Sequence, residues 1–292
     1  MKKKKVLFII NPISGGRKKN SISSMIEKHL DHQLFDYEIV ETEYAGHAAV
    51  LATENRAEKD ILVAVGGDGT INEIAQALKG SNCCLGIIPQ GSGNGLARHL
   101  GISLHVSKAI EQLNYSEEVC IDTAELNGHF FVSIAGIGFD SLIAEMFTQS
   151  KTRGFIGYAS LSTVEFFKYQ EQSYQLIVDG KKLERDAFLI AFANSNQFGY
   201  NTKISPKASL QDGSIDVCIV KKPRLDQMPL GMYQIWNAKA HESKLLEIIP
   251  GKEIQIKPNT LESANIDGES LKVGQEVLVK INPLSLKVWV KK

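Results

Sequence analysis

Short apolar runs alternate with helical patterns from Val6 to about Cys120, and this alternation constrains the fold more than any other feature. Such runs are typical of buried strands, and the segments that follow them have helical periodicity. The expected strands are Val6–Ile10, Tyr37–Glu41, Ile61–Val65 and Leu85–Ile88. The expected helices are Ile22–Leu30, Ala48–Asn55, Ile71–Leu78 and Val106–Leu113. Strands that alternate with helices predict right-handed crossovers and a mostly parallel sheet.

From about Ile121 onward the expected strands follow one another with few helices between them. They are Phe130–Ile134, Ser173–Val178, Leu183–Phe192, Ile215–Val220, Glu253–Ile256, Ala264–Ile266, Val277–Ile281 and Leu286–Val290. Hairpin turns are expected at Asp179-Gly180, Asp212-Gly213 and Asp267-Gly268, because the Asp-Gly pair tolerates the positive φ angles of such turns. Helical patterns are limited to Leu142–Phe147, Ile156–Phe167 and Gln227–His241. An antiparallel β-sandwich is therefore expected for this half.

The length of 292 residues exceeds the usual size of a single hydrophobic core, so two domains are expected. We predict an α/β nucleotide-binding domain over residues 1–121 and a β-rich domain over residues 122–283, with a cleft shared between them. The last segment, about residues 284–292, is expected to pack back on the first domain.

The third expected strand leads directly into a glycine turn, Gly66-Gly67-Asp68-Gly69, and a helix then starts over Thr70 and Asn72. Because glycine has no Cβ, this backbone can approach a phosphate closely, and its amides would point at the anion. Asp68 would repel the phosphate unless Mg²⁺ or a water lies between them. The turn therefore predicts a nucleotide phosphate site and phosphoryl transfer. The alternative is an aspartate that only ends a strand and caps a helix.

A second glycine turn, Gly91-Ser92-Gly93-Asn94-Gly95, follows the fourth expected strand and again leads into a helix. In a parallel sheet both turns open at the carboxyl edge, where open α/β sheets bind ligands. Two such turns at one edge favour the phosphate site over an accidental pattern.

Further motifs surround these turns in a fixed order. They are Asn11-Pro12-Ile13-Ser14-Gly15-Gly16, Thr42 with Gly46-His47-Ala48, Gly136-Ile137-Gly138-Phe139-Asp140, Ile204-Ser205-Pro206-Lys207-Ala208 with Asp212-Gly213, and Asp267-Gly268-Glu269. Together the motifs extend over essentially the whole chain and resemble the diacylglycerol kinase catalytic domain family of lipid kinases. That family includes bacterial diacylglycerol kinases, sphingosine kinases and ceramide kinases. The resemblance implies transfer of the γ-phosphate of ATP to the hydroxyl of a membrane lipid, with Mg²⁺ present.

The first domain is expected to bind the nucleotide through residues of its strand ends and glycine turns. These are Asn11, Ser14, Thr42, Gly66, Gly67, Asp68, Gly69, Thr70, Asn72, Ser92, Gly93 and Asn94. Asp68 is expected to take part in catalysis through Mg²⁺. Arg17 or Lys18 could also reach the phosphates, and their alternative role is solubility.

The second domain is expected to supply the base that accepts the proton of the lipid hydroxyl. The resemblance places this base in Asp267-Gly268-Glu269, and either Asp267 or Glu269 could act. Local sequence alone favours a plain hairpin turn, as at Asp179-Gly180.

The resemblance also implies a structural Mg²⁺ at the Asp212-Gly213 segment. The ligands would be Ser209, Asp212 and Ser214, with backbone carbonyls beside one carboxylate, as suits a hard cation. A plain turn is the alternative there. Asp140 either faces the cleft or caps the helix that begins near Ser141.

Two departures leave the lipid undetermined. Gly95 stands where bacterial members of the family carry a second acid, and the sequence around it is more similar to sphingosine and ceramide kinases. Phe198-Gly199-Tyr200 replaces a glycine triplet of the family.

Two other functions stay open from the sequence. An NAD kinase-like enzyme with a soluble acceptor would share the first glycine turn and the domain layout, although NAD kinases lack the second glycine segment. A non-catalytic nucleotide- or lipid-binding regulator is favoured by Gly95, whereas Asp68, Asp267 and Glu269 argue for catalysis.

Charge, cysteine content and the length of apolar segments indicate which partners and which cell compartment to expect. Lys+Arg 33 balance Asp+Glu 33, which gives no reason to expect a nucleic acid partner. The four cysteines lack metal-ligand spacing, and Cys83, Cys84 and Cys218, which lie in or beside apolar runs, are expected to be buried thiols in a reducing compartment. No segment approaches transmembrane length. We therefore expect a cytoplasmic protein that meets its lipid substrate peripherally at the inner membrane surface, with a homodimer left open.

Overall fold

The computed structural model describes most of the chain. The described residues are 2–14, 20–149, 164–197, 202–224, 226–228, 233–234, 237, 239, 242–258 and 262–291. Gly15 to Lys19 and Phe198-Gly199-Tyr200 lie outside them, as do most of the expected helices Ile156–Phe167 and Gln227–His241. Among the helices of the described part, none is both long and apolar enough to cross a bilayer.

The chain divides into two compact units. The first contains Met1–Ile121 and Leu284–Lys292, and the second contains Asp122–Pro283. Two strands belong to both units by sequence, namely β5 (Glu117–Leu126) and β16 (Val277–Val290). Each unit is described by itself below.

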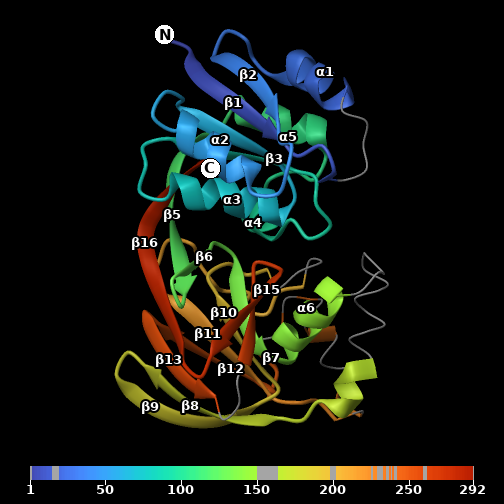
Figure 1. The fold of residues 1–292 in the computed structure, drawn as a ribbon, viewed down its shortest axis with the longest axis vertical. Helices are drawn as coiled ribbons and strands as arrows, with labels where there is room; N and C mark the ends of the chain where they lie inside the picture. The colour runs from blue at the N-terminus through green and yellow to red at the C-terminus, as the bar shows by residue number, and fades with distance from the viewer. Residues whose placement is uncertain are drawn as a thin grey trace. The chain divides into compact units, whose positions relative to one another are not determined.

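The first unit is a parallel sheet flanked by helices (Figure 1). Its elements are β1 (Lys4–Ile10), α1 (Asn20–His29), β2 (Phe35–Glu41), α2 (His47–Asn55), β3 (Ile61–Gly66), α3 (Asp68–Leu78), β4 (Cys84–Pro89), α4 (Gly95–His99) and α5 (Val106–Leu113). The strand order is β2-β1-β3-β4, and the end of β16 joins β4 in parallel at Val288 and Leu85. The predicted α/β fold with a mostly parallel sheet is confirmed.

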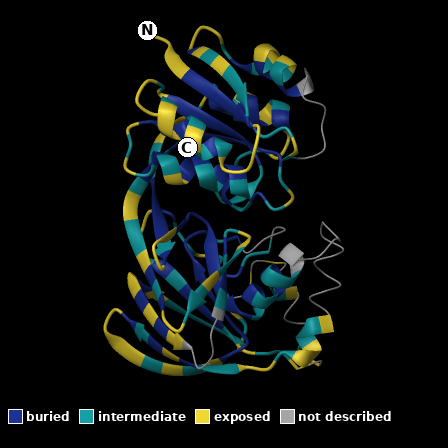
Figure 2. Ribbon diagram, viewed as in Figure 1, coloured by how far each residue is buried: buried dark blue, intermediate teal, exposed yellow. Residues whose placement is uncertain are grey.

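β3, β4 and most of β1 are buried because helices cover the sheet, as the dark ribbons of Figure 2 show, whereas β2 is mostly half-buried or exposed. Val6, Phe8 and Ile10 alternate along β1 and pack in one cluster with apolar side chains of α1 and α5. α2 and α3 pack against each other. This double covering explains why β3 and β4 read as continuous apolar runs rather than as alternating ones.

The second unit is an antiparallel β-sandwich. Its elements are the end of β5, β6 (His129–Phe131), β7 (Ile134–Gly138), α6 (Phe139–Gln149), β8 (Gln172–Val178), β9 (Lys181–Ala187), β10 (Leu189–Ala193), β11 (Ile215–Val220), β12 (Leu246–Gly251), β13 (Glu253–Pro258), β14 (Glu262–Ile266), β15 (Glu269–Gly274) and the start of β16. One sheet has the order β12-β11-β10-β7-β14-β15, and the other runs β16-β13-β8-β9. The predicted sandwich is confirmed.

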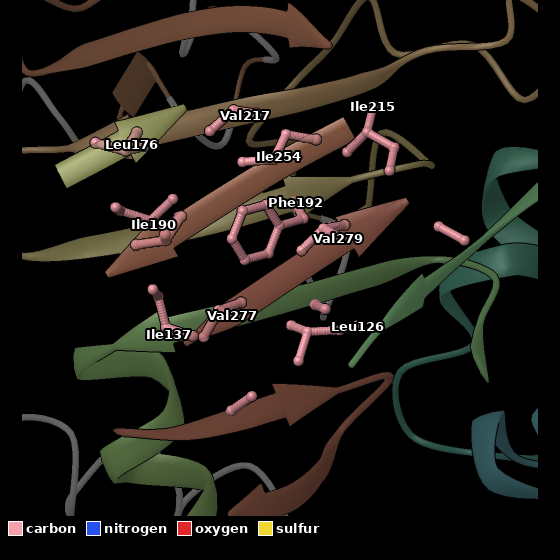
Figure 3. Packing of buried hydrophobic residues seen from close by; sticks show 14 of the residues in the cluster. Leu126, Ile137, Leu176, Ile190, Phe192, Ile215, Val217, Ile254, Val277 and Val279 are labelled. Carbon is pink, nitrogen blue, oxygen red and sulfur yellow. The ribbon is translucent and has the colours of Figure 1, made fainter. Parts of the chain in front are cut away.

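Side chains from both sheets form the core of the sandwich (Figure 3). Ile137, Ile190 and Phe192 come from the first of these sheets, and Ile254 and Val279 come from the second. Alternation along each strand directs these residues inward, because successive side chains of a strand point to opposite faces. The core therefore fixes the register of β7 and β14, which carry the candidate residues of this unit.

Several strand boundaries differ from the predictions. Phe130–Ile134 and Leu183–Phe192 are each split between two strands, whereas Val277–Ile281 and Leu286–Val290 are parts of the single strand β16. Strands β5, β12 and β15 were not expected. The splits escaped prediction because apolar residues continue across the break between the two strands, as at Phe131-Val132 and at Ala187-Phe188-Leu189.

The Asp-Gly pairs do not all form hairpins. Asp179-Gly180 joins β8 to β9 and Asp267-Gly268 joins β14 to β15, with φ of 48° and 83° in the first pair and 47° and 97° in the second. Positive φ at both residues is the geometry of a two-residue hairpin. The prediction for Asp212-Gly213 was wrong, because this pair lies in the loop before β11 and joins no strand pair.

The cysteines of the described part are free thiols. Cys83, Cys84 and Cys218 are buried, and burial raises the pKa of Cys83 and of Cys84 to about 12. These thiols therefore stay protonated near neutral pH and act as small apolar side chains.

Candidate functional site

The two glycine turns lie side by side at the carboxyl ends of β3 and β4. These strands pair in parallel up to Gly66 and Pro89, and the Gln90 amide donates to the Gly66 carbonyl at 2.7 Å. α3 begins at Asp68 and α4 begins at Gly95, so each turn leads directly into a helix. The arrangement supplies two runs of backbone amides at one edge of the sheet.

Other expected nucleotide contacts follow β1 and β2 at the same edge. Asn11 donates its amide to Val65, and Thr42 donates its amide to Ile10, both at 2.9 Å. The Asn11 side chain also donates to Thr70 Oγ1 at 3.0 Å, which joins the turn after β1 to the first glycine turn. The structure thus brings Asn11, Thr42 and Thr70 to the edge that carries the glycine turns, and their contact with nucleotide stays a prediction.

The glycine turns touch each other through their backbones. A Cβ on Gly91 would lie 2.7 Å from Gly67 Cα, and a Cβ on Gly67 would lie 3.2 Å from Gly91 Cα. Gly66 is equally restricted, since a Cβ there would lie 2.6 Å from the Thr70 side chain. These three glycines are therefore needed for close packing of the turns.

The Asp68 carboxylate binds the second turn directly. Its Oδ2 accepts the Asn94 amide and its Oδ1 accepts the Gly95 amide, each at 2.8 Å. Gly93 leaves room for this contact, because a Cβ there would lie 2.8 Å from Asp68 Oδ2. A carboxylate can accept about four hydrogen bonds, so oxygen lone pairs of Asp68 remain for water or a metal. Asp68 thus joins the two turns, and its role through Mg²⁺ stays a prediction.

Asn94 and Arg98 fix the shape of the second turn. Asn94 has left-handed backbone angles, φ 54° and ψ 47°, and its side chain accepts from the Gly91 amide and donates to the Gly91 carbonyl at 2.8 and 2.7 Å. Arg98 donates Nε–H to the Gly93 carbonyl at 2.9 Å. The sequence analysis did not predict this role of Arg98. Its only signal in the sequence is that it lies three residues after Gly95, where the helix begins.

The remaining predicted nucleotide residues occupy the rims of these turns. Ser14 donates its amide to the Asn11 carbonyl at 3.2 Å, and Ser92 is exposed on the second turn. Gly69 and Asn72 are half-buried in the first turns of α3. Arg17 and Lys18, the predicted phosphate contacts of the preceding loop, lie outside the described residues.

In the second unit, Asp267 anchors the hairpin between β14 and β15. Its Oδ2 accepts the Val132 amide at 2.9 Å, and its Oδ1 accepts the amides of Ser133 and Ile134 at 3.0 and 2.9 Å. Its own amide donates to the Ile134 carbonyl at 2.9 Å. Asp267 thereby ties the hairpin to the segment between β6 and β7.

Glu269 follows the same hairpin and is exposed. The comparable hairpin at Asp179 uses its aspartate similarly, because Asp179 Oδ1 accepts the amides of Lys252 and Glu253, each at 2.9 Å. The residue after that hairpin is Lys181 rather than an acid. Asp179 and Asp267 therefore anchor their hairpins in the same way, by accepting backbone amides. Glu269 is the residue that distinguishes the second hairpin from the first.

The predicted metal ligands lie on the loop before β11. The Ser214 amide donates to Asp212 Oδ1 at 3.1 Å, and the Gln211 amide donates to Ser209 Oγ at 3.2 Å. Partial burial and the nearby carboxylates of Asp216 and Asp122 raise the pKa of Asp212. A hard cation would relieve this repulsion, so the loop fits Mg²⁺ electrostatically.

The described residues contain no group of three or more His, Cys, Asp or Glu side chains that could hold a metal. A cation at this loop would therefore need backbone or hydroxyl oxygens beside the Asp212 carboxylate. Such oxygens are ordinary ligands of hard cations, and Mg²⁺ commonly keeps several waters.

Buried polar residues of the sandwich were missed from the sequence. Asp122 has no exposed surface and accepts the Gly213 amide at 2.8 Å, and Asn194 has none and donates to the carbonyls of Asp122 and Val132. The residues next to Asp122 and Asn194 in the sequence do not indicate that these side chains are buried and hydrogen-bonded, because their partners lie some 60 to 90 residues away.

Comparisons with known proteins agree with this geometry. The family model for the diacylglycerol kinase catalytic domain matches residues 5–126, and the model for the YegS C-terminal NAD kinase beta sandwich-like domain matches residues 133–290. A diacylglycerol kinase from Bacillus subtilis (strain 168) is 30% identical over 235 residues, which cover 76% of this chain and 75% of that protein. A Yersinia enterocolitica protein named "Probable lipid kinase YegS-like" is 28% identical over 248 residues, covering 82% and 80%.

Solved structures share the fold. A diacylglycerol kinase from Bacillus anthracis str. Sterne aligns with a TM-score of 0.76 at 21% identity, over 99% of this chain and 98% of that one. An NAD kinase from Archaeoglobus fulgidus in complex with ATP aligns with a TM-score of 0.51 at 12% identity, over 98% and 94%. The motifs, the two-unit fold and the matched relatives lead to one conclusion: this chain is a kinase that belongs to the diacylglycerol kinase catalytic domain family.

Proposed function

We propose that this kinase transfers the γ-phosphate of ATP to a hydroxyl group of a membrane lipid, such as diacylglycerol or a sphingoid base. The observation that carries the proposal is the pair of glycine turns, joined through Asp68 at the carboxyl edge of a parallel sheet. The names of the matched relatives support a lipid as the acceptor. A lipid acceptor of this kind would be met at the membrane surface, where its headgroup hydroxyl is accessible.

On the nucleotide side, the Gly91, Asn94 and Gly95 amides hold the turns together, and the remaining amides of the glycine turns would bind the phosphates of ATP. The side chains of Asn11, Thr42 and Thr70 would line the same edge. Phosphoryl transfer depends mainly on positioning and on stabilising charge, which is what two rigid runs of amides provide. Mg²⁺ would supply the neutralising charge when bound, and Asp68 has oxygen lone pairs left for it or for its waters.

On the acceptor side, we propose Glu269 as the group that takes the proton of the lipid hydroxyl. Three amide donors already occupy positions around the Asp267 carboxylate, so that side chain is held in a structural role. Glu269 is exposed directly beside this anchored hairpin, so an incoming substrate can reach it. A base must lie within hydrogen-bond reach of the proton that it removes, and a firmly held hairpin would keep it there.

The test is transfer of labelled γ-phosphate from ATP in the presence of Mg²⁺. Mixed micelles would contain diacylglycerol, monoacylglycerol, ceramide or sphingosine, with NAD and buffer alone as controls. We expect labelled lipid from one of these classes, and we expect its formation to be lost in Asp68→Ala. Labelling of NAD instead of lipid would contradict the proposal and favour the NAD kinase-like alternative. Transfer to none of the acceptors would contradict it as well.

A further prediction concerns Mg²⁺ at Asp212. Because the pKa of Asp212 is raised in the folded state, the protonated carboxyl stabilises the fold at low pH, and this contribution is lost as the pH rises through the folded-state pKa. Near neutral pH without metal, Asp212→Asn should therefore be more stable than the wild type. Mg²⁺ at a hundred times its Kd would stabilise the wild type by about 2.7 kcal/mol and the variant hardly at all.

Thermal unfolding with and without Mg²⁺ measures this difference. Asp186→Asn is the matched control, because Asp186 is an exposed aspartate of the same unit and that variant should keep the Mg²⁺-dependent rise in Tm. An equal rise in Tm for the wild type and for Asp212→Asn would show that Asp212 holds no metal.

A further inference from the structure

A second set of contacts holds the hairpin that carries Glu269, independently of the Asp267 anchor. Asn265 lies on β14, and its side-chain Oδ1 accepts a hydrogen bond from the Gly268 amide at 3.0 Å. Its Nδ2 donates to Oδ2 of Asp140 at 2.9 Å. Gly268 directly precedes Glu269 in the chain, so this path runs from Asp140 through Asn265 to the peptide next to the proposed base.

Asp140 is a buried acid with 6% of its surface exposed, in the first turn of α6. The amides and the dipole at the start of a helix favour a negative charge there. The neighbouring strand makes room for it at Gly136, where a Cβ would lie 2.6 Å from Asp140 Oδ2. Asn265 pairs with Gly136 in the sheet, which places its side chain beside the carboxylate.

The chemistry of the pair fixes the orientation of the Asn265 amide group. An ionised carboxylate only accepts hydrogen bonds, so Asn265 must present its NH₂ group to Asp140. The carbonyl oxygen of Asn265 is then left to accept the Gly268 amide. The Asp140 carboxylate and the Gly268 amide therefore require the same orientation of Asn265, so Asp140 supports the bond to the hairpin without touching Gly268 or Glu269 in any contact described above.

We propose that Asp140 and Asn265 form a positioning pair that holds Glu269 for proton removal from the acceptor hydroxyl. This inference rests on the proposed function of Glu269 as the base. The Asp179 hairpin, which shares the anchoring aspartate, has Ile177 at the position of Asn265 and therefore cannot form the corresponding side-chain bond. The extra contact thus occurs at the hairpin that carries the acid.

The first test is kinetic. Asn265→Ala should lower kcat for lipid phosphorylation roughly 10- to 100-fold, because a small displacement of a catalytic group has an effect of this size. The KM for ATP should stay unchanged. Asp140→Ala should have a similar effect, whereas Asp140→Asn keeps an oxygen that can accept from Asn265 and should retain most of the activity. In a Glu269→Gln background, Asn265→Ala should cause no further loss, because it acts through Glu269.

Asn127→Ala is the matched control. Asn127 also ties a hairpin of this unit, by donating to the carbonyls of Val273 and Glu276 at 3.1 and 2.9 Å and accepting the Leu278 amide at 2.7 Å. Its replacement should lower Tm without changing kcat. Hydrogen exchange gives a readout besides activity, since the Gly268 amide should exchange faster in Asn265→Ala and in Asp140→Ala than in the wild type.

Three outcomes would overturn the proposal. Unchanged exchange of the Gly268 amide in Asp140→Ala would show that the pair does not hold the hairpin. A further loss of kcat from Asn265→Ala in the Glu269→Gln background would show a general structural effect instead of positioning. Full activity of Glu269→Gln would show that Glu269 is not the base. This failure of the proposed function is distinguishable from a failure of the positioning pair, because it is seen in the Glu269→Gln single variant.

Discussion

Glu269→Gln is expected to lower kcat for lipid phosphorylation by roughly 10²- to 10⁴-fold, the range typical of a lost general base. The substitution keeps the shape of the side chain and removes only its ability to take a proton. Because Glu269 is exposed and the hairpin is held by Asp267 and Asn265, the free energy of unfolding should hardly change. Steady-state kinetics in lipid micelles and thermal unfolding measure the two quantities.

Glu276→Gln is the control for this substitution. Glu276 is an exposed glutamate of the same unit that pairs with Lys257 at 3.0 Å, and exposed pairs contribute little to stability. We expect wild-type kcat for that variant. Wild-type kcat for Glu269→Gln would contradict the assignment of the base.

The anchoring role of Asp267 can be separated from the chemistry of Glu269 in the same assays. Asp267→Ala leaves three partly buried amides without their acceptor, which should cost about 1–3 kcal/mol of stability and also displace Glu269. Asp179→Ala removes the comparable anchor of the other hairpin and should lower Tm while kcat stays unchanged. A loss of kcat in both variants would mean that general loosening of the sandwich, and not this hairpin, limits the reaction.

Gly91→Ala is expected to weaken ATP binding by about tenfold to a hundredfold. The added Cβ would lie 2.7 Å from Gly67 Cα and 2.9 Å from Asn94 Oδ1, so the two glycine turns would have to move apart. Overpacking of this kind costs roughly 1–3 kcal/mol, and here it falls on the amides proposed to bind phosphate. Titration with ATP in a calorimeter measures the affinity directly.

Gly80→Ala separates this effect from the general strain of replacing glycine. Gly80 has φ of 72° and nothing within 4 Å of an added Cβ, so alanine there is strained but meets no neighbour. We expect a loss of stability of roughly 1–2 kcal/mol and unchanged ATP affinity. If Gly91→Ala binds ATP as tightly as the wild type, the close contact of the turns is not needed for the nucleotide.

The strands and helices of the first unit were predictable because their signals are local. β3 and β4 are continuous apolar runs that end in glycine turns, and α5 spans Val106–Leu113 as expected from its apolar spacing. Strand boundaries in the second unit were less predictable. In Leu183–Phe192, apolar residues continue from Ala187 past the end of β9 into β10, and only the register with β8 and β11 decides where one strand ends.

The candidate site divides in the same way. The glycine turns and the acids Asp68, Asp267 and Glu269 could be singled out from the sequence, because their spacing and residue types match the motifs of the family. The contacts of Asp68 with Asn94 and Gly95 could not be found, since they join positions 26 and 27 residues apart. The sequence also left Asp267 and Glu269 equivalent as candidate bases, and the three amides bonded to Asp267 are the reason that we propose Glu269.

By itself, the sequence determined the α/β and β-sandwich classes, and its resemblance to the family singled out Asp267 and Glu269 as candidate bases. The fold classes follow from hydrophobic period, which acts over a few neighbouring positions. Only the tertiary structure decided that Asp267 is an anchor and that Asp140 reaches the hairpin through Asn265, 125 residues away. The reason is that a hydrogen bond depends on distance and direction in space, and packing of the two sheets sets both.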